Sequence, residues 1–306
     1  MKFLRQILAL SACVLGLSVA GSTLADDKVC TTCHDASWEK PILSIYKTRH
    51  GVKADKRTPG CQSCHGTSDN HLKSPSNSPD MTFKANSKNV PEARNSTCMG
   101  CHKAGARSHW EGSQHASRDV TCASCHTIHA EKDKVLAKAT QFEVCFTCHK
   151  TERAMSQHIS HHTVMEGKVA CSDCHNPHGS IAPKLLVKNG VNSTCFQCHP
   201  DKRGPLLWEH SPVTDDCTNC HNPHGSTMAP MLKARVPWLC QECHVNEHAS
   251  SLVVSGNVLS GGAVTTNAGQ QAAGGQNPGN RLGRSCLYCH VQIHGSNHPA
   301  GAKFNR

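Results

Sequence analysis

Ten copies of one five-residue motif, Cys-x-x-Cys-His, constrain what this chain can fold around. They begin at residues 30, 61, 98, 122, 145, 171, 195, 217, 240 and 286. Together they use twenty of the 21 cysteines; the other is Cys13, near the N-terminus. Disulfides and zinc are ordinary uses of many cysteines, but neither requires a histidine directly after every second cysteine. The pattern therefore disfavours both.

The same motif is the attachment site of c-type haem. Its two thiols add to the vinyl groups of the haem, and the adjacent histidine is carried to the iron. The sequence thus predicts ten covalently bound haem c groups. The predicted attachment cysteines are Cys30, Cys33, Cys61, Cys64, Cys98, Cys101, Cys122, Cys125, Cys145, Cys148, Cys171, Cys174, Cys195, Cys198, Cys217, Cys220, Cys240, Cys243, Cys286 and Cys289. The predicted proximal ligands are His34, His65, His102, His126, His149, His175, His199, His221, His244 and His290.

Composition supports a fold that is built around cofactors. Aromatic residues make up only 4% of the chain, which also holds 23 glycines and 15 prolines. Such a chain cannot bury enough of its own apolar surface to offset the entropy lost on folding. We therefore expect a multihaem cytochrome c with short helices and long irregular loops around a row of ten haems, and little or no sheet.

Fourteen histidines remain outside the motifs, and ten of them recur in register with them. Read in pairs, the motifs form a two-haem unit with one histidine before the second motif and one soon after it. The unit occurs five times, and the spacing of its later copies, 47, 50 and 45 residues, indicates an internal repeat. The predicted distal ligands are His50, His71, His115, His129, His162, His178, His210, His224, His248 and His294. Two choices stay open, because His298 could replace His294 and His161 could replace His162.

The segments "CSDCHNPHGS" at residues 171–180 and "CTNCHNPHGS" at residues 217–226 are nearly identical. His178 follows His175 by three residues, so the two side chains leave the backbone close together. Three residues cannot pass around the edge of a haem to its opposite face. His178 must therefore reach the iron of another haem, and the same holds for His129 and His224. Each such histidine is expected to link two haems, which predicts a continuous row.

Iron with two histidine ligands has no open coordination position, which favours electron transfer over catalysis. We expect ten low-spin, six-coordinate haems of low potential and no enzymatic activity. Two other readings stay open: a multihaem reductase of nitrite or a related oxyanion with one open iron, and an electron store with a compact haem cluster.

The N-terminal segment resembles a secretory leader. Lys2 and Arg5 precede a short apolar run, and small residues lead to Ala25, so residues 1–25 are expected to be removed on export to the periplasm.

Without the leader, the formal charge of +10 falls to +8. About twenty haem propionates, offset by about ten ferric charges, bring the oxidised protein near −2. The basic balance is thus no argument for a nucleic-acid partner.

Two segments interrupt the motifs. Residues 66–97 are rich in serine, asparagine and proline and are expected to form a long loop. Residues 249–285 separate the last two motifs and contain no ligand-type side chain before Cys286. They are read as a mobile loop or as a contact with a partner.

The ten motifs, the paired "CHNPHGS", residues 201–226 and the ending "CLYCHVQIHGSNHPAG" resemble the Mtr-type periplasmic decahaem cytochromes of metal-reducing bacteria. That resemblance implies two pentahaem halves, here residues 26–166 and 167–306. The two-haem units would place this division inside the third unit, between Cys148 and Cys171.

The resemblance also implies partners. In the family the cytochrome sits inside an outer-membrane β-barrel porin, and an extracellular multihaem cytochrome docks outside. Electrons arrive from periplasmic or inner-membrane cytochromes and leave for external acceptors such as metal oxides. A related branch supplies an extracellular dimethyl sulfoxide reductase. A soluble periplasmic shuttle is the alternative role.

Overall fold

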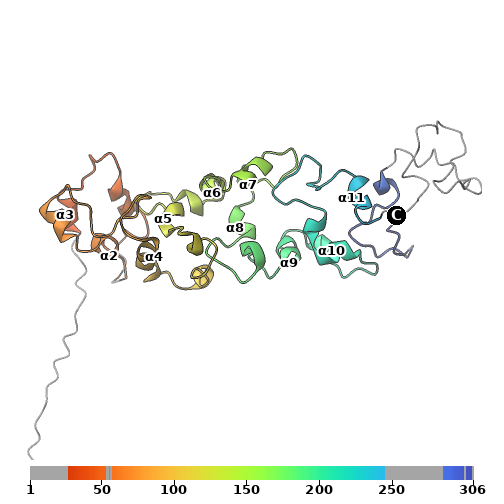
Figure 1. Ribbon diagram of the computed structural model, residues 1–306, viewed down its shortest axis with the longest axis horizontal. Helices are drawn as coiled ribbons and strands as arrows, with labels where there is room; N and C mark the ends of the chain where they lie inside the picture. Colours follow the sequence, from red (N-terminus) through yellow and green to blue (C-terminus); the bar gives the residue numbers. More distant parts are fainter. Residues whose placement is uncertain (1–26, 53–54, 56, 245–284, 300, 305–306) are drawn as a thin grey trace, which may run out of the picture. The chain divides into compact units, whose positions relative to one another are not determined.

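The computed structural model describes residues 27–52, 55, 57–244, 285–299 and 301–304 (Figure 1). Contacts divide the chain into two compact units. Unit 1 is Met1–Thr82 with His129–Glu131, and unit 2 is Phe83–Ile128 with Lys132–Arg306. The expected leader, His248 and all but the last residue of the 249–285 insertion lie outside the described residues. The predicted pentahaem halves stay a prediction.

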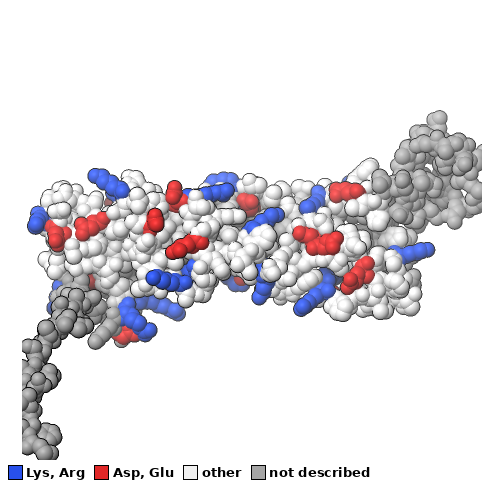
Figure 2. Space-filling view, turned by 60° about the horizontal axis from the view of Figure 1, so that its bottom comes forward, with Lys and Arg blue, Asp and Glu red and all other residues white. Residues whose placement is uncertain are grey.

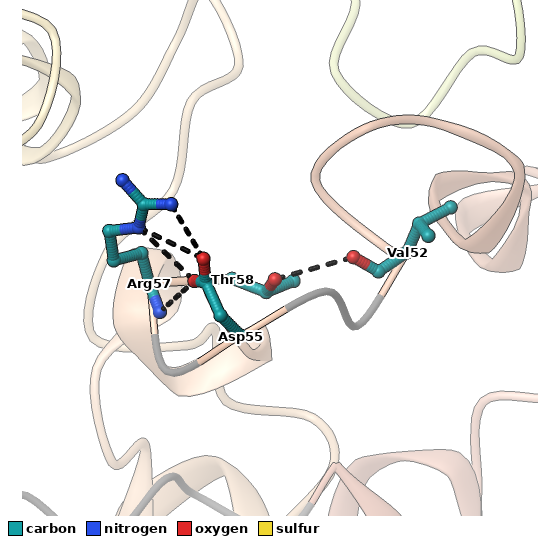
Figure 3. A network of polar contacts seen from close by, with 4 residues as sticks. All are labelled: Val52, Asp55, Arg57 and Thr58. Atoms are coloured by element: carbon teal, nitrogen blue, oxygen red, sulfur yellow. Dashed lines mark hydrogen bonds and ion pairs between the residues drawn. The ribbon is translucent and has the colours of Figure 1, made fainter.

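Unit 1 holds short helices around the first two motifs. These are α1 (Lys28–Thr31), the 3₁₀ helix η1 (Ile42–Lys47), α2 (Cys61–His65) and α3 (Asp69–Lys73). Just before α2, Arg57 pairs with Asp55, with Nη2 2.6 Å from Oδ2, and the Thr58 hydroxyl donates to the carbonyl of Val52 (Figure 3). The Arg57 side chain is 91% exposed, so this ion pair adds little stability by itself.

Unit 2 contains the other eight motifs on short helices of the same kind. Figure 1 shows its labelled helices running from α4 and α5 at one end to α10 and α11 at the other, with α8 below α7. The α-helices are α4 (Pro91–Met99), α5 (Cys122–Cys125), α6 (Lys138–Cys145), α7 (Lys150–Met155), α8 (Cys171–Cys174), α9 (Val191–Cys195), α10 (Ser211–Asp215) and α11 (Trp238–Gln241). The 3₁₀ helices are η2 (Gly105–Arg107), η3 (Ala116–Arg118), η4 (Lys134–Leu136), η5 (Pro183–Leu185), η6 (Pro200–Lys202), η7 (Cys217–Asn219) and η10 (Cys286–Tyr288).

The expected fold class is confirmed. The described residues form helices, turns and loops, and their only β-type pairings are isolated bridges. No helix in this part of the chain is long and apolar enough to cross a membrane.

The expected loop at residues 66–97 was wrong in part, because it contains α3 and most of α4. Pro91 occupies the first turn of α4, where its missing N–H costs no hydrogen bond. Glu92 adds a favourable negative charge at the same end. The helix then runs into the third motif and ends at Met99. The loop predicted from the serine- and proline-rich composition is therefore limited mainly to the residues between α3 and α4.

The internal repeat is visible in the backbone. His175 bridges Leu186, and 46 residues later His221 bridges Leu232. In each copy the residue after the motif histidine donates its N–H to a carbonyl nine residues on, from Asn176 to Leu185 at 2.7 Å and from Asn222 to Met231 at 2.8 Å. The repeat predicted from the motif spacing therefore has a structural counterpart in these two copies.

The protein itself supplies only a thin core. Among the described residues, five hydrophobic side chains are buried: Trp110, Phe146, Ala170, Ala182 and Leu186. No large side chain in this part of the chain is completely shielded from solvent. Several large apolar side chains are exposed, including Ile159 at 83% and Ile181 at 80%. The short helices are therefore not held by packing against one another in the way a helix bundle is.

Candidate haem-binding sites

One helical turn places the three functional side chains of each motif on the same side. The backbone N–H of His126 donates to the carbonyl of Cys122 at 2.9 Å, and His175 donates to Cys171 at 2.9 Å. Residues three and four apart lie on one face of such a turn, so both thiols and the imidazole face the same way. This is the arrangement that covalent haem with an adjacent iron ligand requires.

Side chains within or beside the even-numbered motifs hold these turns. In the second, fourth and sixth motifs the third residue, Ser63, Ser124 or Asp173, accepts the backbone N–H of the residue before the first cysteine, at 3.1, 3.2 and 2.9 Å. In the eighth motif Asp216 instead accepts the N–H of Thr218 at 2.7 Å. These bonds satisfy N–H groups that a helix start otherwise leaves without partners.

Eight of the ten motif histidines lie beside a second imidazole at a nearly constant distance. Two imidazoles that bind one metal ion from opposite sides, with bonds of about 2.0 Å, have ring centres about 6 Å apart. The ring centroids are 6.0 to 6.3 Å apart in the pairs His34–His71, His65–His129, His115–His149, His126–His178, His162–His199, His175–His224, His210–His244 and His221–His294. The donor set of each pair therefore fits an iron with two axial histidines.

The pairs join different motifs. His178 lies beside His126 of the fourth motif, although His175 is only three residues away in sequence. His224 in turn lies beside His175, and His129 lies beside His65. Each of these histidines thus extends from its own motif to the preceding even-numbered one.

The structure also separates the two open choices. His294 lies beside His221, whereas the backbone carbonyl of His298 accepts the indole N–H of Trp208 at 3.1 Å. His162 lies beside His199, whereas His161 Nε2 lies 3.3 Å from a carboxylate oxygen of Glu166. In both cases the histidine that lies beside a motif histidine is the one predicted first, and its role as a ligand stays a prediction.

The repeated "HNPHGS" loop holds two of these pairs at once. The carbonyl of Pro177 accepts the Nδ1–H of His115 at 2.8 Å, while the next residue, His178, lies beside His126. The Asn176 side chain accepts the N–H of His178 at 3.2 Å and so shapes the turn. A hydrogen bond to Nδ1 leaves Nε2 of His115 for a metal and fixes the orientation of the ring.

The second copy of the loop repeats these contacts. The Pro223 carbonyl accepts from His162 Nδ1 at 2.7 Å, and the side chain of Asn222 accepts the N–H of His224 at 3.3 Å. Gly225 has φ +138°, and a Cβ there would clash with the backbone of Met155. The ten residues are therefore repeated because each of these contacts is made twice.

Neighbouring motifs are tied together by a residue that sequence reasoning missed. It lies three positions before the first cysteine of an odd-numbered motif. Asn95 accepts the N–H of Cys122 at 2.9 Å, Asn192 accepts that of Cys217 at 2.7 Å, and in unit 1 Asp27 accepts that of Cys61 at 2.9 Å. A polar side chain at this position before three of the five odd motifs was the signal that could have revealed it.

Thiol contacts show that the motifs of unit 2 follow one another in order. A hydrogen bond with the Cys98 thiol lowers the pKa of Cys122, and the same contact relates Cys145 to Cys171 and Cys195 to Cys217. These contacts join motif three to four, five to six and seven to eight.

Electrostatic interactions of the second cysteines of the fourth, sixth and eighth motifs indicate the intervening links. The pKa of Cys125 is raised mainly by burial and secondly by the nearby Cys148. The pKa of Cys220 is raised mainly by burial and secondly by the nearby Cys243. Burial and then nearby Cys195 raise the pKa of Cys174. The attachment sites from the third motif to the ninth are thus adjacent in sequence order. Cys240 and Cys286 add the tenth in the same way.

Four of the second histidines lie where burial disfavours the charged imidazole. Burial lowers the pKa of His129, His178, His224 and His294, and the charge of a neighbouring histidine adds to the effect in each case. Neutral imidazole is the form that binds a metal. These four residues are also the four that follow an even-numbered motif by three or four positions.

A cavity of about 590 Å³ lies beside His294 and is lined by Asp201, Lys202 and Leu206, among others. His294 is the residue that connects this cavity to the pair with His221, although no residue of the eighth motif lines the cavity. The ammonium of Lys202 lies 2.9 Å from a carboxylate oxygen of Asp201 in the cavity wall.

Four predicted ligands are not assigned by these pairs. His50, His102 and His290 have contacts of their own, and His248 lies outside the described residues. No group of three or more His, Cys, Asp or Glu side chains suited to a metal ion occurs in the described part of the chain. The recurring unit there is the pair.

Comparison with known proteins identifies the family. The chain is 44% identical over 281 residues to the multihaem cytochrome MtrA of Shewanella baltica (strain OS185), which covers 90% of this chain and 80% of that protein. The chain belongs to the MtrA family of multihaem cytochromes. The resemblance noted from the paired motifs is therefore confirmed, and the chain is a c-type cytochrome with covalently bound haem.

Smaller matches agree with this assignment. Residues 161–204 and 210–249 match the family model described as a doubled CXXCH motif. Residues 61–141 match the model of cytochrome c-type NrfB-like proteins. The cytochrome c-type protein NrfB of Haemophilus influenzae is 31% identical over 117 residues, which covers 33% of this chain and 50% of that protein.

Proposed function

We propose that this MtrA-family member is a periplasmic decahaem protein that conducts electrons across the outer membrane. It would do so inside a β-barrel porin, from periplasmic or inner-membrane cytochromes to an extracellular multihaem cytochrome and external metal oxides. The observation that carries the proposal is the order of sites in unit 2, where consecutive motifs are adjacent and histidine pairs link every second motif. The barrel and the outer partner come from the Mtr-type resemblance.

The chain's own residues determine what the cofactors can do. Bound haem supplies reversible one-electron exchange between ferric and ferrous iron. The cysteine pairs would hold each haem covalently, and the histidine pairs would supply two ligands to each iron. A substrate would then find no exchangeable position at these eight sites, which leaves electron transfer between adjacent sites as their chemistry.

The charged surface fits transfer between protein partners better than binding of a polyanion. On the face drawn in Figure 2, basic and acidic side chains are interspersed rather than separated by sign. Several basic residues of unit 2 are already paired with acidic ones, as in Lys138 with Asp173 at 2.8 Å and Lys134 with Glu143 at 2.7 Å. Such a surface has no extended basic stripe on that face.

We expect a broad redox titration of the purified holoprotein. Adjacent sites with similar ligands interact, so each electron added raises the cost of the next, and the apparent potentials belong to the coupled set. Spectroelectrochemical reduction should extend over a much wider range of potential than a single one-electron curve. A curve that fits one midpoint with independent haems would contradict the close row.

Liposomes test the proposed conduction. The protein in complex with its barrel should allow an external reductant to reduce an enclosed dye or metal oxide. Barrel alone and cytochrome alone, each at the same concentration, are the matched controls and should give no enclosed reduction. If the protein never co-isolates with a barrel and reduces only soluble partners, the shuttle role replaces the conduit. If the enclosed reduction requires an extracellular dimethyl sulfoxide reductase as the outer partner, the related branch is the right one.

A further inference from the structure

The fourth haem-binding site differs from the other even-numbered sites in what its motif histidine contacts. In four of these five sites a backbone carbonyl accepts the Nδ1–H of the histidine. The distances are 2.8 Å for His65 to Met81, 2.8 Å for His175 to Lys184, 2.9 Å for His221 to Pro230 and 2.6 Å for His290 to Lys303. In the fourth site, His126 Nδ1 lies 2.7 Å from Oδ2 of Asp133, a carboxylate.

The Asp133 carboxylate is held in place. Its Oδ1 accepts backbone N–H groups from Thr127 at 3.3 Å and from Val135 at 3.4 Å, which leaves Oδ2 for His126. The Asp133 side chain is 12% exposed and that of His126 is 26% exposed. Little water therefore screens the contact, and hydrogen bonds that involve an ionised group are the stronger kind. The neighbouring Lys134 has its ammonium 2.7 Å from Glu143.

The opposite side of this site offers no matching contact. His178 Nδ1 is buried and has no hydrogen-bond partner in the protein. Its ring lies beside the buried Trp110, with centroids 6.3 Å apart. The two axial imidazoles of the fourth site therefore differ, since one donates to a carboxylate and the other donates to no protein group.

We propose that Asp133 sets the potential of the haem attached at Cys122 and Cys125, and makes it the most difficult of the even-numbered haems to reduce. A carboxylate that accepts the Nδ1–H gives the imidazole more negative character, so that it is a stronger donor through Nε2. A stronger donor stabilises ferric iron over ferrous iron and lowers the reduction potential. The proposal rests on the ligand assignment in the proposed function, and Asp133 acts through His126 as a positioning residue.

Both the donor and the acceptor of the electron at this site are haems of the same protein. One electron passes from a neighbouring ferrous haem of the same protein to the ferric haem at Cys122 and Cys125, and the donor becomes ferric. No bond forms or breaks, and the Nδ1 proton stays between His126 and Asp133. In a row that runs through the third, fourth and fifth motifs, this site would be an uphill step that incoming electrons occupy only briefly.

Arg107 places a positive charge near the same site. Arg107 lies close enough to His178 to lower the pKa of that residue, after the larger effects of burial and His126. Its positive charge favours ferrous iron and opposes Asp133. A variant that changes only Asp133 keeps the contribution of Arg107 constant. The difference in reduction potential between the variant and the unchanged protein therefore measures the effect of the carboxylate.

Asp133→Asn in the holoprotein tests the proposal, because it removes the charge while keeping the size and an oxygen acceptor. Replacing a group that orients a metal ligand typically changes metal affinity or activity 10- to 100-fold. A tenfold change in the ferric-to-ferrous ratio corresponds to about 59 mV for one electron. We therefore expect one electron of the ten to titrate at a potential higher by about that amount, and the other nine to titrate as in the unchanged protein.

Glu152→Gln is the matched control. Glu152 Oε2 lies 3.7 Å from His149 Nδ1, beyond a hydrogen bond, and both side chains are more than a third exposed. The same carboxylate-to-amide change there should move the titration much less. Asp133→Glu, which retains the charge, should keep most of the low potential.

Spectra recorded on the same samples distinguish this proposal from the ligand assignment. Low-spin haem at all sites in the wild type and in Asp133→Asn, with an unshifted titration, would overturn the role of Asp133 alone. Loss of haem or a high-spin signal in both Asp133→Asn and Asp133→Glu would show a structural role and would also overturn it. A high-spin fourth haem in the wild type would instead contradict the ligand assignment.

Discussion

Without covalent haem, this chain is expected to remain unfolded. The described residues bury only five hydrophobic side chains, two of them alanines, and the helices are short. Fixing the backbone costs about 1–2 kcal/mol per residue, and so small a core cannot offset that sum. Attachment of the haems supplies the missing apolar contact and the histidine–iron bonds, so folding and attachment should be coupled as in small metalloproteins.

The measurement compares the haem-free chain, made without the haem-attachment machinery, with the holoprotein. We expect the haem-free chain to show a disordered far-ultraviolet circular dichroism spectrum, poor amide dispersion and no cooperative melting transition. The holoprotein, processed in the same buffer, is the control. A haem-free chain that melts cooperatively with dispersed amide signals would show that the protein has a sufficient core of its own.

Replacing His178 by Met is expected to change the haem at Cys122 and Cys125 and to leave the haem at Cys171 and Cys174 intact. The reason is the pairing of His178 with His126 and of His175 with His224. Met/His ligation raises the potential relative to two histidines. One haem of ten should therefore titrate at a clearly higher potential and show the spectrum of methionine ligation, and a structure of the variant should locate it at the fourth motif.

His161→Met is the matched control for that variant. His161 is also next to a predicted ligand, but it contacts Glu166 and the carbonyl of His158 rather than a motif histidine. It should leave all haems unchanged. If His178→Met altered the haem at Cys171 and Cys174 instead, the linkage between alternate motifs would be wrong.

The sequence predicted the fold class because the motif is also the structural element. Cys-x-x-Cys-His forms one turn wherever it is described, and little else in the chain has the length or apolar periodicity for a longer helix. The reasoning about His175 and His178 needed only chain geometry, since three residues cannot cross a haem. Composition misled at residues 91–97, where Pro91 reads as a loop residue but begins a helix.

The partner of each second histidine could not be predicted, because it depends on contacts between distant residues. His115 and Pro177 are 62 residues apart, and His210 and Ile293 are 83 apart. The roles of Asn95 and Asn192 were missed for the same reason, because both lie inside helices that lead into a motif and their hydrogen-bond partner belongs to a later motif. Each side chain accepts a bond from the next motif.

An experimental structure of the holoprotein would locate each iron and its two axial ligands, and so tests the pairing of the histidines. The account predicts that the irons of the fourth, sixth and eighth motifs lie between His126 and His178, His175 and His224, and His221 and His294. It also predicts that haems from the third motif to the tenth follow one another in motif order. An iron bound by a different pair of side chains, an iron with an open axial position, or a compact cluster that breaks this order would contradict it.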